Sequence, residues 1–104
     1  MTFDGYQKIA LSTAVYPDEY RMVYPTLGLT GEAGEVAEKV KKYIRDGTEC
    51  REDLKKELGD VLWYLSAIAS DLNLSLDDIA QSNIKKLESR MKLGKIKGSG
   101  DNRG

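Results

Sequence analysis

Apolar side chains recur every three or four residues along most of this chain, which is the spacing of amphipathic α-helices. Tyr16-Pro17-Asp18 interrupts the pattern, and we expect a connecting loop from there to Pro25. No segment alternates with the period of a β-strand. The expected helices are residues 4–14, a second from Pro25 or Thr26 to Asp46, then 51–72 and 75–93. The sequence therefore predicts an all-α fold, a four-helix bundle.

Each expected helix has one apolar stripe that we predict to be buried. Gly47 and Gly94 follow the second and fourth helices as caps, and Asn73 stops the third. Ser75 opens the fourth with the spacing of a capping box, although Asp78 replaces the usual glutamate. The predicted core positions are Tyr6, Ile9, Ala10, Ala14; Leu29, Ala33, Val36, Ala37, Val40, Ile44; Leu54, Leu58, Val61, Leu62, Leu65, Ile68, Leu72; Leu76, Ile79, Ala80, Ile84, Leu87 and Met91.

Composition narrows the possible chemistry. A length of 104 residues with a formal charge of −1 indicates one domain with no strong general attraction to nucleic acid or membranes. We expect a single helical domain over 1–94 and a Gly/Lys-rich arm over 95–104. Cys50 is the only cysteine, so no intrachain disulfide forms and a cytoplasmic location is expected. The absence of histidine excludes histidine-ligated zinc and Ser-His or Cys-His nucleophiles.

One short acidic pattern occurs twice, as residues 32–36 (EAGEV) and 57–61 (ELGDV). Each copy places two carboxylates one helical turn apart, beside the apolar stripe. If the two stripes pack together, Glu32, Glu35, Glu57 and Asp60 converge, and their mutual repulsion favours a hard cation such as Mg²⁺, with Mn²⁺ as the alternative. The alternative interpretation is two solvated helix faces. Gly28, Gly31 and Gly34 predict an unusually close backbone approach on the same helix.

Several further residues have two interpretations each. Glu38 is a candidate general base or an outer ligand, or else a surface partner of Lys41 or Lys42. Tyr64 follows Asp60 by one turn and either reaches a phosphate or packs against the core. We expect Asn83 to be half-buried, bonded to backbone or to a nucleotide. Lys86 and Arg90 share a face that holds phosphate or is simply solvated, and Trp63 and the tyrosines stack on a base or belong to the core.

The acidic repeat resembles the signature of MazG-type, all-α nucleoside triphosphate pyrophosphohydrolases, Glu-Glu-x-x-Glu, a spacer, then Glu-x-x-Asp. Residues 28–36 match its first half, except that Gly31 replaces the first glutamate, and residues 57–62 match its second half. The segments 83–90 and 98–103 resemble small bacterial and phage members of the family.

The resemblance implies Mg²⁺-dependent hydrolysis of a (deoxy)nucleoside triphosphate to a monophosphate and pyrophosphate, in nucleotide-pool housekeeping. It assigns Glu32, Glu35, Glu57 and Asp60 to the metal, with Glu38 as our candidate base. Substrate contacts fall to Asn83, Lys86 and Arg90. A homodimer or homotetramer is expected, with no nucleic-acid polymer and no membrane as partner. The competing hypotheses are a non-catalytic nucleotide-binding regulator and a structural helical oligomer.

Overall fold

The computed structural model describes residues 1–94, so the predicted arm over 95–104 lies outside the described residues. Within that range the chain is helical and has no strand, which confirms the all-α prediction. None of these helices is long and apolar enough to cross a membrane. The elements are α1 (Phe3–Leu11), a short 3₁₀ helix η1 (Asp18–Tyr20), α2 (Val23–Asp46), α3 (Arg51–Asp71) and α4 (Leu76–Lys92).

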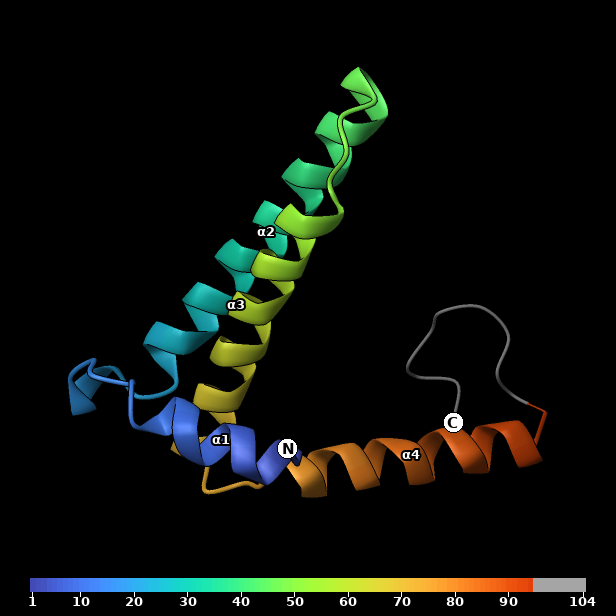
Figure 1. Ribbon diagram of the computed structural model, residues 1–104. Helices are drawn as coiled ribbons and strands as arrows, with labels where there is room; N and C mark the ends of the chain where they lie inside the picture. The colour runs from blue at the N-terminus through green and yellow to red at the C-terminus, as the bar shows by residue number, and fades with distance from the viewer. Residues whose placement is uncertain (95–104) are drawn as a thin grey trace.

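α2 and α3 form a long antiparallel hairpin, whose packing is the most extensive in the molecule (Figure 1). Gly47 ends α2 in the left-handed conformation with φ 69°, and its amide donates to the carbonyl of Tyr43 at 2.8 Å. This is the cap that the sequence predicts. The hairpin is the rigid element that carries both acidic repeats.

Two helix boundaries differ from the predicted ones. α1 ends at Leu11 because the hydroxyls of Ser12 and Thr13 donate to the carbonyls of Ile9 and Ala10, at 2.6 and 2.7 Å, and so compete with further helical hydrogen bonds. α2 begins before Pro25, since proline is tolerated in the first helical turn, where amides have no intrahelical acceptor.

α1 holds the turn between α3 and α4 through two polar side chains. Gln7 donates to the carbonyl of Leu74 at 2.9 Å and to Ser70 Oγ at 3.1 Å, and accepts from the amide of Leu76 at 2.8 Å. Asp4 accepts from Ser75 Oγ at 2.7 Å and from the amide of Asp77 at 3.2 Å. These contacts fix the direction in which α4 leaves the hairpin.

The helices do not close into a compact four-helix bundle within one chain. Figure 1 shows α4 extending away from the base of the α2–α3 hairpin. The radius of gyration is 16.3 Å, against about 13 Å for a compact domain of this length. Among the described residues the substantial packing of α4 is with α1 alone.

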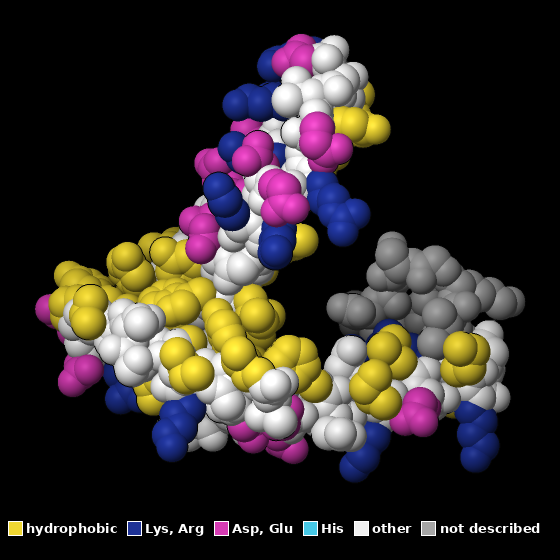
Figure 2. Space-filling model, in the orientation of Figure 1, with side chains coloured by type: hydrophobic (Ala, Val, Ile, Leu, Met, Phe, Trp, Pro, Cys, Tyr) yellow, Lys and Arg dark blue, Asp and Glu magenta, His cyan; other side chains and the backbone are white. Residues whose placement is uncertain are grey.

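Much of the predicted core is therefore exposed in the single chain. Ala10 and Leu76 are buried as predicted, but Ile84 is 50% and Met91 71% exposed, because no helix of the described residues packs against this part of α4. Apolar side chains also lie open around α1 and the start of α2, as Figure 2 shows. The predicted core positions that are exposed are Ile9, Ala33, Ala37, Val40, Ile44, Leu58, Leu65, Leu72, Ile79, Ile84, Leu87 and Met91.

Candidate metal centre

The antiparallel register of α2 and α3 brings carboxylates from both acidic repeats together. Glu32, Glu57 and Asp60 each offer a carboxylate oxygen, and these oxygens lie within 4.8 Å of one another. Glu57 and Asp60 are one turn apart on α3, so a single helix face presents both to α2. The convergence predicted from the repeated pattern thus occurs for three of the four acids.

Burial and the neighbouring acids together disfavour the ionised form of Glu32. Partial burial raises the pKa of Glu32, as do its hydrogen bonding with the Glu57 carboxyl and the negative charge of Asp60. Oε2 of Glu57 is buried, and when Glu32 is ionised no described residue donates a hydrogen bond to it. When these carboxylates are ionised they only accept, so none can satisfy another. A divalent cation fits this set of oxygen donors because it supplies the missing positive charge.

Glu35 and Glu38 lie on the same helix but outside the cluster of three. Both are exposed. The charge of Glu35 nevertheless contributes to raising the pKa of Glu32, after burial and the nearer acids, so it borders the cluster. Glu38 forms an ion pair with Lys41, with 3.2 Å between Oε1 and Nζ, which is the alternative that the sequence left open.

Tyr64 lies between the acidic cluster and Tyr24, a neighbour that the sequence did not predict. A Cβ added to Gly28 would be 2.2 Å from Tyr64 Cε1, so only glycine accommodates the ring. Of the three glycines predicted to permit a close backbone approach, Gly28 is instead approached by the side chain of Tyr64, and the positions of Gly31 and Gly34 are open among the described residues. Burial, then Tyr24, then the charges of nearby acids raise the pKa of Tyr64.

Tyr24 and Tyr16 continue a row of rings from Tyr64, and Trp63 packs beside Tyr64. Tyr24 and Tyr64 are 6.4 Å apart by ring centroids, and Tyr16 stacks on Tyr24 at 5.0 Å with an interplanar angle of 20°. Trp63 meets Tyr64 edge-on at 5.1 Å, and its indole nitrogen donates to Thr13 Oγ1 at 2.8 Å. Helical periodicity gave no signal for Tyr16, because it lies in a loop and is positioned by tertiary contacts alone.

The α4 residues predicted to bind substrate do not join the acids within one chain. Asn83 and Lys86 are exposed, so the expectation that Asn83 is half-buried is wrong for the single chain; its cause is again the unpaired face of α4. Arg90 is buried, being 6% exposed, which disagrees with the alternative interpretation of Arg90 as a solvated cation; phosphate binding by Lys86 and Arg90 stays a prediction.

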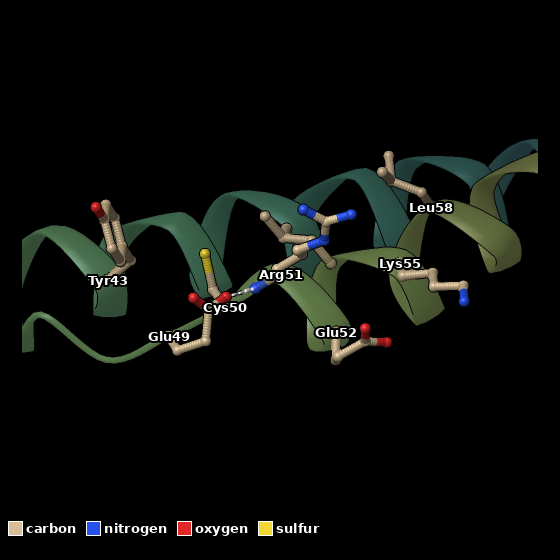
Figure 3. A pocket seen from close by; sticks show the side chains of 8 residues that line it. Tyr43, Glu49, Cys50, Arg51, Glu52, Lys55 and Leu58 are labelled. Carbon is tan, nitrogen blue, oxygen red and sulfur yellow. Dashed lines mark hydrogen bonds between the residues drawn. The ribbon is translucent and has the colours of Figure 1, made fainter.

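A separate groove of about 690 Å³ lies at the tip of the α2–α3 hairpin. Figure 3 shows Tyr43, Cys50 and Leu58 at this groove, with the charged ends of Arg51, Glu52 and Lys55 directed apart. The side chain of Glu49 accepts from the backbone amide of Arg51 at the start of α3. No convergent set of ligands is formed here, so the groove does not compete with the acidic cluster as a metal centre.

The fold and this cluster define a class: an all-α protein whose helical hairpin brings three carboxylates together. Residues 25–94 match the model of the MazG nucleotide pyrophosphohydrolase domain. The chain belongs to this family. It is also 47% identical to the Gene 37 protein of Mycobacterium phage L5, over 99% of this chain and all of that protein. No solved structure matches the chain significantly.

Proposed function

We propose that the protein is a Mg²⁺-dependent pyrophosphohydrolase that cleaves a (deoxy)nucleoside triphosphate to the monophosphate and pyrophosphate. The observation that carries this proposal is the meeting of Glu32, Glu57 and Asp60 from two helices, with a buried Glu57 oxygen that lacks a donor when Glu32 is ionised. Membership of the MazG family supports the reaction class. Removal of unwanted nucleotides from the pool is the corresponding cellular role.

In this proposal the three clustered acids hold the cation, and Glu35 completes the set from the edge of the cluster. When bound, the cation neutralises phosphate charge and favours deprotonation of the attacking water. Glu38 is the proposed base for that water. It becomes available when its exposed ion pair with Lys41 opens, and such pairs are worth only about 0–1 kcal/mol.

The row of tyrosines gives the nucleotide an orientation. Glu32 lies eight residues after Tyr24 on α2, a rise of about 12 Å, with Gly28 and the ring of Tyr64 between them. Nucleobases stack on aromatic rings. With phosphates at the acids, the base would therefore lie toward Tyr24 and Tyr16.

Surface area supports assembly with a second copy. The chain exposes 7836 Å², whereas a compact monomer of 11.6 kDa exposes about 5,800 Å². The excess, about 2,000 Å² in one chain, is of the size that stable dimers bury. A homodimer, or a tetramer of two dimers, would cover the apolar face of α4. It would also allow Asn83, Lys86 and Arg90 on α4 of one copy to approach the acids of the other.

The test is pyrophosphate release from a panel of canonical and modified (deoxy)nucleoside triphosphates, with Mg²⁺ and with a chelator. Wild type should release pyrophosphate and an equal amount of monophosphate only with the metal. Glu57→Gln should abolish release while keeping the helical circular dichroism, and Glu88→Gln on α4 serves as the matched control. Metal and nucleotide binding without turnover would replace the enzyme with a nucleotide-binding regulator. Absence of both would leave a helical scaffold.

A further inference from the structure

Asp71, at the carboxyl end of α3, is the hub of a set of contacts far from the acids. Its Oδ2 accepts from the hydroxyl of Tyr16 at 2.7 Å and from the amide of Met22 at 2.8 Å. Its Oδ1 lies 3.6 Å from Nε of Arg21, and the carboxylate side chain is only 8% exposed. A negative charge at the carboxyl end of a helix is unfavourable by itself, so these three donors account for its place there.

The backbone held by Asp71 adopts a rare conformation. Met22 has φ 66° and ψ −42°, and the amide of Val23 donates to the carbonyl of Arg21 at 2.7 Å, which forms a γ-turn of the rarer, positive-φ kind. Such a turn is strained for a residue with a side chain and persists only where its surroundings fix it. The Met22 residue is also the N-cap of α2 and makes no side-chain capping bond, so Asp71 fixes the point at which α2 begins.

These contacts decide where the aromatic row lies. The hydroxyl of Tyr16 donates to Asp71, and the Tyr16 ring stacks on Tyr24, which directly follows the γ-turn. Tyr24 in turn neighbours Tyr64, whose ring fills the space over Gly28 one turn before Glu32. One carboxylate thus fixes both the loop tyrosine and the helix start that make up the far end of the row.

We propose that Asp71 is a positioning residue for substrate recognition: it locks the Tyr16–Tyr24 stack as the wall against which the nucleobase binds. This inference rests on the proposed function, because it concerns the base of the same nucleotide. Asp71 itself would touch neither the nucleotide nor the cation. Asp71 would affect the affinity for the nucleotide and not the affinity for the cation, because the α2–α3 hairpin holds Glu32, Glu57 and Asp60.

The experiment compares Asp71→Ala with Asp71→Asn in the full chain. Alanine removes the acceptor for all three donors, whereas the asparagine Oδ1 gives up only the ion pair with Arg21 and can still accept from Tyr16 and Met22. Tyr16→Phe removes one donor and leaves the carboxylate, and it serves as a milder second variant should Asp71→Ala fold poorly. Asp18→Asn is the matched control, because Asp18 is exposed in the same segment and its side chain makes no hydrogen bond with the described residues.

We expect Asp71→Ala to raise KM for the best nucleoside triphosphate about tenfold, as for loss of one base–aromatic stack, with kcat and the Mn²⁺ Kd within about twofold of wild type. Tyr16→Phe should move KM in the same direction by less, and Asp71→Asn and Asp18→Asn should resemble wild type. If KM were unchanged in both Asp71→Ala and Tyr16→Phe, the positioning role of Asp71 would be overturned, and turnover by wild type would still support the proposed enzyme. A loss of Mn²⁺ binding in Asp71→Ala that paralleled the rise in KM would also overturn this role, because it would indicate displacement of the whole hairpin. Wild type that neither binds nor turns over nucleotide would overturn both proposals.

Discussion

The ring of Tyr64 lies so close to the backbone of Gly28 that an added Cβ would be 2.2 Å from its Cε1 atom. Gly28→Ala should therefore lower the free energy of unfolding by about 1–3 kcal/mol, because the ring or the helix must shift. Chemical denaturation monitored by circular dichroism measures this. Gly31→Ala is the control, since no described atom lies within 4 Å of its added Cβ.

The protonation of Glu32 predicts how the metal-free protein responds to pH. The pKa of this group is raised above 4.5 in the folded chain, by burial and then by the neighbouring acids. The protonated carboxyl is thus favoured in the folded state, and its stabilising effect is full below about pH 4.5 and lost as the pH rises through the folded pKa. Glu32→Gln should flatten this component of the pH dependence.

Mg²⁺ should act on the same group in the opposite direction, because a cation favours the ionised carboxylates. Thermal unfolding between pH 4 and 7, with Mg²⁺ and with chelator, measures both effects. Glu88→Gln should leave the pH profile unchanged. A Glu32→Gln profile that matched wild type under both conditions would contradict the assignment of Glu32 to the cluster.

The γ-turn at Met22 predicts a stabilising substitution. Met22→Gly should raise the free energy of unfolding by up to about 1 kcal/mol, since glycine adopts positive φ without the steric cost of a Cβ. The greater freedom of glycine in the unfolded chain opposes part of this gain. Urea unfolding measures the stability of Met22→Gly against that of the control Val15→Gly. Val15 lies in the exposed loop before η1, and its replacement should not raise the free energy of unfolding.

The polar clamp on the α3–α4 turn can be tested at Gln7. Gln7→Ala leaves the buried amide of Leu76 without its side-chain acceptor and should cost about 1–3 kcal/mol of stability. Gln81→Ala, at an exposed position on α4, should cost far less. Equal effects of the two changes would show that the clamp contributes nothing.

Mixing two inactive variants tests whether α4 serves the site of a second copy. Glu57→Gln lacks an acid and Lys86→Ala lacks the proposed phosphate contact. In a dimer with sites shared between copies, one site of the mixed species has both defects and the other has none, so activity returns on co-refolding. Sites built within single chains would each keep one defect, and the mixture would stay inactive.

Much of the fold was predictable from sequence because its signals are local. The helices follow from apolar periodicity, and Gly47, Asn73 and Ser75 mark their ends through backbone conformation and capping. Burial was less predictable. The stripe on α4 is apolar as a buried helix requires, yet Met91 is 71% exposed, since the surface that covers such a stripe need not belong to the same chain.

In the candidate site, too, the local features were predictable from sequence and the long-range contacts were not. The repeated acidic pattern predicted that Glu32, Glu57 and Asp60 would meet, because helical spacing and antiparallel pairing determine it. Nothing local indicated that Tyr16 would stack on Tyr24, since this depends on a hydrogen bond to Asp71, 55 residues further along the chain.

The pairing of Asp4 with Asp77 also has a consequence for the order of events in folding. The two residues are 73 positions apart, so their contact closes nearly the whole described chain, at an entropic cost that local contacts do not carry. The α2–α3 hairpin can form from neighbouring segments as soon as both helices have been synthesised. α1 has no such neighbour: it packs mainly on α3, so it is translated long before its partner, and its contacts with the start of α4 form later still.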